Sequence, residues 1–199
     1  MKSIYVYGAG GHGSVVADIA KACGFDEILY IDDGENEYKT FEDIKLNIDI
    51  PICLGIGSNS VRKNLVEKLL KHHFNIITLV HPSAIVSENT KLGIGTVVMP
   101  NVVVNTDSEI GKGVILNTGA VIEHDNIIKD FVHLSPRVTL AGNVIVQEAS
   151  HIGIGSCVIE GIIIGKNCLI GAGSVVVKNI QDGTISYGNP CKKVKDKNE

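Results

Sequence analysis

His124 and Asp125, preceded by Glu123, form the strongest candidate for acid–base chemistry in this chain of 199 residues. An imidazole has an ordinary pKa of about 6.5, so near neutral pH it can accept a proton from a reacting group. A carboxylate that holds one ring nitrogen favours the imidazolium that forms. A lone histidine is more often an ordinary surface residue, so the sequence indicates a base only if the fold presents this pair to a substrate.

A glycine-rich segment near the N-terminus can bind phosphate. Gly8, Gly10 and Gly13 follow a short apolar run with the spacing G-x-G-x-x-G, and Asp32 comes 19 residues after Gly13. Between a strand and a helix, such glycines let phosphate approach the N–H groups that begin the helix. The motif fits either NAD or a nucleotide sugar. We favour the nucleotide sugar, because a dinucleotide site usually needs two mononucleotide-binding halves.

The first 80 residues have the pattern of an α/β domain. Strands are expected at residues 4–7, 28–31, 52–56 and 76–80. One helix is expected over residues 14–23, and a second should end at Leu70 with Asn59 or Ser60 as its N-cap. Strands that alternate with helices imply a parallel sheet. We therefore expect residues 1–80 to form a Rossmann-like domain.

From Leu92 onward the period of the sequence changes to six. Fifteen successive positions at this spacing are aliphatic, and the position four residues further on is mostly small or β-branched. This is the hexapeptide signature of a β-helix, in which each sixth forms one face and one corner of a triangular prism. We expect a left-handed parallel β-helix within residues 81–199, with a C-terminal tail and five 18-residue coils over residues 92–181.

The 18-residue coil also places side chains relative to one another. His124 and Gly142 are 18 residues apart, as are His133 and His151, so each pair should stack on successive coils. A glycine N–H above a base is well placed to receive an oxyanion.

Composition and charge exclude some partners and compartments. The formal net charge is -4, so we expect neither a nucleic acid nor a membrane surface as a partner. No stretch approaches the roughly 20 apolar residues of a membrane span, and the N-terminus lacks a signal-peptide pattern. Five scattered cysteines without C-x-x-C spacing fit reduced thiols, so we expect a cytoplasmic protein.

The two halves together resemble the sialic-acid O-acetyltransferase and UDP-4-amino-sugar N-acetyltransferase family of hexapeptide acyltransferases. The resemblance rests on the Gly8–Gly13 loop, Asp32-Asp33, Gly57-Ser58-Asn59 and the segment from Asn117 to Asp125. In that family the α/β domain holds the nucleotide sugar and the prism binds acetyl-CoA. The resemblance also implies a homotrimer with active sites between subunits.

The resemblance assigns roles residue by residue. It implies that His124 is the general base and that Asp125, which stands where the relatives have glutamate, raises its basicity. The implied contacts to the nucleotide sugar are Gly10, Gly11, His12, Asp32, Asp33 and Gly57. The implied contacts to acetyl-CoA are His133, Gly142, Ile154 and Ala172. No resident metal is implied.

These assignments predict an acetyl-CoA-dependent N-acetyltransferase that acts by direct transfer on a nucleotide-linked 4-amino sugar, for a bacterial surface glycan or glycoprotein. Three alternatives stay open. One is O-acetylation of a free acidic sugar such as sialic acid, and another is a non-catalytic nucleotide-sugar-binding protein. The third is a γ-class carbonic anhydrase, with zinc held by His124, His133 and His151.

Overall fold

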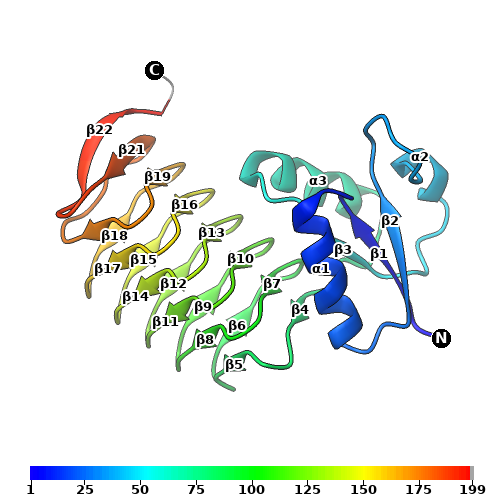
Figure 1. The fold of residues 1–199 in the computed structure, drawn as a ribbon, viewed down its shortest axis with the longest axis horizontal. Coiled ribbons are helices and arrows are strands. Elements are labelled where there is room, and N and C mark those ends of the chain that lie inside the picture. Colours follow the sequence, from blue (N-terminus) through cyan, green and yellow to red (C-terminus); the bar gives the residue numbers. More distant parts are fainter. Residues whose placement is uncertain (198–199) are drawn as a thin grey trace.

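The structure is a computed structural model that describes residues 1–197. An α/β unit over residues 3–71 is followed by a long stack of short strands (Figure 1). This arrangement confirms the predicted fold class, a Rossmann-like unit followed by a hexapeptide β-helix. The division into domains of residues 1–80 and 81–199 stays a prediction, and residues 198–199 of the second lie outside the described residues.

The α/β unit contains one small parallel sheet between helices. Its elements in chain order are β1 (Ser3–Tyr7), α1 (Gly11–Ala22), β2 (Glu27–Ile31), α2 (Phe41–Ile44), β3 (Ile52–Leu54) and α3 (Asn59–Lys71). The strand order is β2-β1-β3, with both pairings parallel. Neighbouring residues of a strand face opposite sides, so Ile4 and Val6 pack with α1, whereas Tyr5 and Tyr7 pack with α2 and α3. From β1 the chain goes to β2 on one side of the sheet and then crosses to β3 on the other side. Open parallel sheets usually bind ligands at such a switch point, outside the carboxyl ends of the strands.

The turn from β1 into α1 explains part of the glycine motif. Gly8 has a φ of +109°, in the left-handed region that favours glycine. A Cβ on Gly13 would lie 1.8 Å from the Gly8 carbonyl oxygen, so Gly13 is required by close approach. A Cβ on Gly10 or Gly11 would meet nothing within 4 Å. Gly8 and Gly13 therefore shape the turn, whereas Gly10 and Gly11 leave the start of α1 open.

The β-helix consists of two-residue strands that visit three faces in turn. Face 1 contains β4 (Leu79–Val80), β7 (Val97–Val98), β10 (Ile115–Leu116), β13 (His133–Leu134), β16 (His151–Ile152) and β19 (Leu169–Ile170). Face 2 contains β5 (Ile85–Val86), β8 (Val103–Val104), β11 (Val121–Ile122), β14 (Thr139–Leu140), β17 (Cys157–Val158) and β20 (Val175–Val176). Face 3 contains β6 (Lys91–Leu92), β9 (Glu109–Ile110), β12 (Ile127–Ile128), β15 (Ile145–Val146) and β18 (Ile163–Ile164). The antiparallel pair β21 (Thr184–Tyr187) and β22 (Lys192–Asp196) extends face 1 at the far end of the stack.

Turns between these strands form three edges of the prism. We call them edge 1/2, edge 2/3 and edge 3/1, after the faces that each joins. In a three-sided prism each edge lies opposite the remaining face, so edge 2/3 lies opposite face 1. The side chains on an edge repeat every 18 residues, because Ile115 pairs with His133 and His133 with His151.

The β-helix begins one coil before the five predicted over residues 92–181, and the prediction of a fourth α/β strand over residues 76–80 is wrong. Leu79–Val80 pairs with Val97–Val98 and so begins the β-helix, which has six strands on face 2. Only Ile76 bridges to the α/β sheet, at Ile52. The reason is visible in the sequence, since Val80 and Val86 extend the aliphatic period of six backwards from Leu92.

The predicted cap of α3 is also wrong. The N-cap residue is Ser58, and its side chain makes no capping hydrogen bond. The Asn59 side chain is used elsewhere, because its Nδ2 donates to the carbonyl oxygens of Ala149 and Ser150 on the prism. Asn59 thus joins the two halves of the molecule rather than closing its own helix.

A buried amide fixes the turn that carries His124. Asn126 is fully buried, and its Nδ2 donates to the carbonyl oxygens of Glu123 and Ala141 at 2.6 and 3.0 Å. Its Oδ1 accepts a hydrogen bond from the N–H of Val144. These bonds join the coil of His124 to the next coil at edge 2/3. They hold the His124 turn in register with the coil of Gly142.

The α/β unit packs against the first coils of the prism. Residues of α1, such as Val16 and Ile19, share one apolar core with Leu79 and Val97. Phe131, from edge 3/1, enters the second core with α3. None of the helices in residues 1–197 has the length and apolar character needed to cross a membrane.

Candidate active site

His124 and Asp125 form the turn at edge 2/3 between β11 and β12. The Nδ1 of His124 lies 2.7 Å from the Oδ2 of Asp125, and the imidazole side chain is 58% exposed. Asp125 has a φ of +59°, which aspartate tolerates better than most side chains. The shorter side chain therefore reaches Nδ1 of the imidazole, and within residues 1–197 Nε2 has no hydrogen-bond partner.

The environment of His124 makes it a stronger base. The hydrogen bond to Asp125 raises the pKa of His124 above its usual value, and the negative charges of Asp125 and Glu123 act in the same direction. Glu123 is not the direct partner, because its Oε2 accepts a hydrogen bond from Asn105 at 2.8 Å. Of the two flanking carboxylates, only Asp125 orients the ring.

Gly142 lies against the imidazole on the next coil, as the 18-residue spacing predicts. A Cβ on Gly142 would lie 2.7 Å from Cε1 and 2.9 Å from Nε2 of His124. The Asn143 N–H donates to the His124 carbonyl oxygen at 3.0 Å, which ties the two turns together. Gly142 therefore provides the room that the ring occupies.

Replacing Asp125 with asparagine should move the acid limb of kcat/KM to lower pH. A base acts in its neutral form, so activity is lost as the pH falls through its pKa. Loss of the carboxylate lowers the pKa of His124 towards its usual value, because Asp125 is the main cause of the raised pKa. The plateau rate should fall by about tenfold or less, since a weaker base removes the proton less well. The measurement is kcat/KM as a function of pH.

Asp107→Asn is the matched control for that prediction. Asp107 has the same turn position one coil earlier, with a φ of +58°. Its carboxylate contacts Thr106 and no histidine. An equal shift of the acid limb in Asp107→Asn would mean that surface charge in general, rather than the Asp125 contact, tunes the base.

Three other histidines form a row where the α/β unit meets face 1. The rings of His133 and His151 are stacked, with centroids 4.5 Å apart, and the His12 ring lies 6.4 Å from that of His133. Burial, together with the charge of Arg62, lowers the pKa of His12 to about 4. Burial, His151 and Arg62 lower the pKa of His133 to about 3. These rings are therefore neutral near pH 7 and can hydrogen-bond a ligand without a charge.

The residues assigned to acetyl-CoA do not meet within one chain. His133 lies on face 1, whereas Gly142 lies with His124 on edge 2/3, opposite that face. Ile154 and Ala172 stack 18 residues apart on edge 1/2, in the turns between face 1 and face 2, and Ile154 is 54% exposed. One ligand can therefore touch all four residues only if it lies between two copies of the chain; within a single chain it would contact only part of the set.

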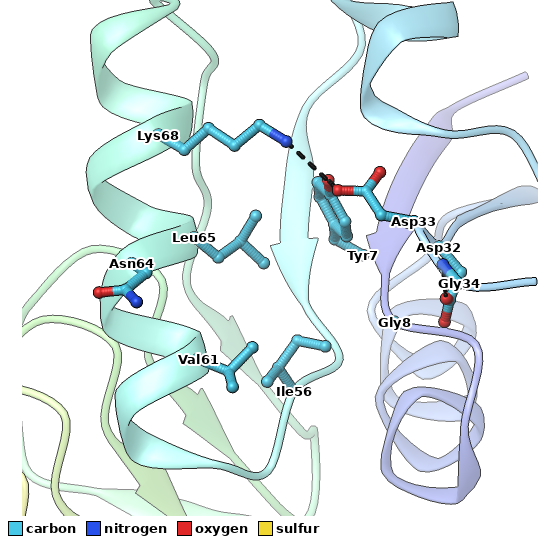
Figure 2. Close-up of a pocket in the computed structure, with 10 residues that line it drawn as sticks. All are labelled: Tyr7, Gly8, Asp32, Asp33, Gly34, Ile56, Val61, Asn64, Leu65 and Lys68. Atoms are coloured by element: carbon cyan, nitrogen blue, oxygen red, sulfur yellow. Dashed lines mark hydrogen bonds and ion pairs between the residues drawn. The ribbon is translucent and has the colours of Figure 1, made fainter.

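A cavity of about 330 Å³ opens at the carboxyl ends of β1, β2 and β3. Figure 2 shows an apolar wall of Ile56, Val61 and Leu65 on one side and Gly8, Asp32 and Asp33 on the other. Such a cavity can take a flat base between an apolar wall and polar groups. Of the residues assigned to the nucleotide sugar, it contains Asp32 and Asp33.

Both aspartates are held by hydrogen bonds within the chain. Asp32 accepts from the N–H of Ala9 at 2.8 Å and from that of Gly34 at 2.9 Å, which lower its pKa. Asp33 accepts from the Tyr7 hydroxyl at 2.6 Å and from Lys68 at 3.2 Å (Figure 2). Burial raises the pKa of Asp33, but the hydrogen bonds outweigh it and the net pKa is lowered. Asp32 therefore anchors the glycine loop, and Asp33 anchors the far wall of the cavity.

His12 and Gly57 face a different region from the two aspartates. A Cβ on Gly57 would lie 4.0 Å from Cγ of His12. Gly57 lines a second cavity of about 520 Å³, together with His151 and the ion pair between Lys63 and Glu148. Gly10 and Gly11 are exposed at the start of α1 and line neither of these cavities. The sugar-nucleotide set is therefore spread over the end of the sheet rather than gathered in one pocket.

Sequence reasoning missed three residues of the site. Tyr7 and Lys68 complete the Asp33 contacts, and Arg62 is 1% exposed beside the histidine row. Tyr7 ends an apolar run and so indicates only a buried strand. Lys68 lies on a helix rich in polar residues, and no sequence signal separates it from surface positions. Arg62 stands three, four and seven residues before Leu65, Val66 and Leu69, so helical spacing could have placed it on the buried side of that helix.

The three histidines proposed for zinc are not brought together. His124 lies on the edge opposite face 1, which carries His133 and His151. Within residues 1–197, no group of three or more His, Cys, Asp or Glu side chains is placed to hold a metal ion. A zinc site built from these three residues is therefore not supported in a single chain.

Comparison with known proteins gives consistent matches for both halves. A family model described as the PglD N-terminal domain matches residues 3–69. A curated relative is the UDP-N-acetylbacillosamine N-acetyltransferase of Bacillus subtilis, 42% identical over a match of 110 residues, with 48% of this chain covered. The match spans about half, 50%, of that relative's length.

Solved structures match over the whole chain. One is a variant of GDP-perosamine N-acetyl transferase from Caulobacter crescentus in complex with CoA and GDP-perosamine. It is 33% identical, with a TM-score of 0.94 and coverage of 98% of each chain. Another is the acetyltransferase domain of PglB from Neisseria gonorrhoeae in complex with acetyl coenzyme A. It is 36% identical, with a TM-score of 0.92 and coverage of 97% of this chain and 99% of that one.

Proposed function

The chain belongs to the family of nucleotide-sugar N-acetyltransferases, and from this membership we propose that it transfers the acetyl group of acetyl-CoA to the amine of a nucleotide-linked 4-amino sugar. The observation that carries the proposal is the exposed His124–Asp125 pair packed on Gly142. A relative bound to acetyl coenzyme A and another bound to CoA and GDP-perosamine support the two substrate classes. The nucleotide is proposed to be UDP, since a curated relative is named for a UDP-sugar.

His124 acts as the general base in the proposed reaction. The sugar nitrogen attacks the acetyl carbon of the thioester, and Nε2 of His124 takes the proton that the nitrogen loses. The C–N bond forms and the C–S bond breaks, so CoA leaves as a thiolate that takes up a proton. Asp125 holds the Nδ1 side of the ring and stabilises the imidazolium. No covalent acetyl-enzyme is needed, because direct transfer requires only positioning, a base and an oxyanion donor.

Gly142 is the proposed oxyanion donor. Within residues 1–197 its N–H has no backbone acceptor, although its carbonyl accepts from Gly161 at 3.1 Å. An N–H next to the base can stabilise the charge that develops on the thioester oxygen. Ile154 and Ala172 on edge 1/2 are proposed to contact acetyl-CoA.

The proposed assembly is a homotrimer with the active site between subunits. His12 of the α/β unit meets His133 on face 1, whereas His124 of the same chain is on the opposite edge. A second copy can bring its edge 2/3 to the histidine row of the first. Outward apolar side chains on faces 2 and 3, such as Ile85 and Ile163 at 68% and 41% exposure, offer the surfaces for this packing.

The proposed setting is the synthesis of a bacterial surface glycan or glycoprotein sugar in the cytoplasm. All five cysteines are free, which fits a reducing compartment.

A thiol-release assay tests the proposed function. The purified protein is mixed with acetyl-CoA and, in parallel, with a UDP-linked 4-amino-4,6-dideoxy hexose, its GDP-linked counterpart and free sialic acid. We expect rapid thiol release with the UDP-linked sugar and at least tenfold slower release with the other two acceptors. Faster release with the GDP-linked sugar would correct the nucleotide, whereas release only with sialic acid would replace N-acetylation by O-acetylation. Binding of the nucleotide sugar without turnover would favour a non-catalytic binding protein.

A further inference from the structure

Arg62 on α3 is a buried cation without a carboxylate partner. It is 1% exposed, and no ion pair within the described residues includes it. Burial lowers the pKa of Arg62 to about 10, so it stays charged near neutral pH. Desolvation of a cation costs several kcal/mol unless its hydrogen bonds are satisfied. Arg62 satisfies them with oxygen atoms of peptide and amide groups, which points to a role in fixing the backbone.

The Arg62 residue holds three successive carbonyl groups after β3. Its Nη1 donates to the carbonyl oxygens of Ile56 and Gly57 at 3.1 and 3.0 Å, and its backbone N–H donates to that of Ser58 at 2.9 Å. In a trans peptide the N–H points opposite to the C=O. The N–H groups of Gly57, Ser58 and Asn59 are therefore turned away from Arg62.

The same guanidinium fixes this loop to the prism. Its Nε donates to the Gly113 carbonyl oxygen at 2.6 Å, and its Nη2 donates to that of Phe131 at 3.0 Å. Gly113 and Phe131 lie on successive turns of edge 3/1, and Phe131 is two residues before His133. One side chain thus sets where the Gly57 loop stands relative to His133.

The loop held by Arg62 faces the row of histidines. Gly57 lies against His12, and the His12 ring is 6.4 Å from that of His133. Nη2 of Arg62 also donates to Oδ1 of Asn59 at 2.9 Å. Nδ2 of Asn59 in turn donates to the Ala149 carbonyl oxygen on the prism. Arg62 and Asn59 therefore act together as one link between the α/β unit and the β-helix.

We propose that Arg62 is a positioning residue for the nucleotide sugar, because it turns the N–H groups of Gly57 and Ser58 away from its own buried side chain and fixes them relative to His133. The proposal rests on the proposed function, since it takes Gly57 as a contact to the nucleotide sugar. Arg62 itself touches no substrate. Its effect reaches the bound sugar through the direction of two peptide groups and the placement of the α/β unit on face 1.

The test is Arg62→Lys, with KM measured separately for each substrate. Lysine keeps the charge, but its compact ammonium cannot reproduce the planar fork that reaches five acceptors. We expect KM for the nucleotide sugar to rise at least tenfold, while KM for acetyl-CoA changes less than twofold. A rise of both KM values by the same factor would overturn the proposal.

Leu69→Ala is the matched control for loss of stability. Leu69 is fully buried on the same helix and packs in the core of the α/β unit. It should lower the melting temperature at least as much as Arg62→Lys. Both variants are assayed well below their melting temperatures. If Leu69→Ala raises KM for the nucleotide sugar as much as Arg62→Lys does, Arg62 has only a structural role.

Calorimetry separates this proposal from the proposed function. UDP and GDP are titrated into the wild type and both variants without acetyl-CoA, so no turnover is required. We expect the wild type to bind one of these two nucleoside diphosphates, and Leu69→Ala to bind it with the same affinity. Arg62→Lys should bind it at least tenfold more weakly. Equal binding by Arg62→Lys overturns the role of Arg62, even if the enzyme is active. If the wild type binds but no sugar is acetylated, the proposed reaction fails while the role of Arg62 stands.

Discussion

Replacing His124 with alanine should lower kcat by about 10²- to 10⁴-fold, which is the usual contribution of a positioned general base. The imidazole is 58% exposed and, within residues 1–197, its ring hydrogen-bonds only to Asp125, so its loss leaves no cavity in the core. The melting temperature and the affinity for UDP should therefore stay close to those of the wild type. The measurement is thiol release at saturating acetyl-CoA and nucleotide sugar.

His73→Asn is the control for histidine loss in general. His73 is exposed after α3, with a φ of +60° that asparagine tolerates well. It should keep wild-type kcat. If His124→Ala keeps more than about a third of wild-type kcat, the base must be sought elsewhere.

The repeat made the β-helix predictable, because one aliphatic residue in six is a signal that survives in strands of only two residues. The start of the β-helix was missed for a physical reason. Leu79 and Val80 lie on face 1 as the first coil, but they directly follow Ile76, which bridges to β3. A short apolar run gives no sign of which sheet it joins, so residues 76–80 look like one more α/β strand.

The candidate site was predictable where spacing fixes neighbours. The 18-residue period places Gly142 on His124 and His151 on His133, and the structure confirms both pairs. Contacts between distant elements follow no such period. The link from Arg62 on α3 to Gly113 and Phe131 on the prism depends on how the two halves pack.

Replacing Gly142 with alanine should lower kcat by about 10²-fold without unfolding the protein. Gly142 has no positive φ, so alanine fits its backbone, and the glycine is needed only for the close approach of the ring. The new Cβ would lie 2.7 Å from Cε1 of His124 and 2.9 Å from Nε2, so the imidazole must move. A displacement of about 1 Å can cost roughly 10²-fold in rate.

The control for Gly142→Ala is Glu160→Ala, which changes the same position of edge 2/3 on the following coil and should leave kcat unchanged.

A double variant of His124 and Gly142 then identifies the cause of the loss. If the new methyl group acts by displacing the imidazole, adding Gly142→Ala to His124→Ala should cost almost nothing further, because the ring that it displaces is gone. If the two losses multiply instead, Gly142 contributes through something other than the position of His124. The comparison is kcat for the four proteins of the cycle, with the Gly142 N–H retained in all of them.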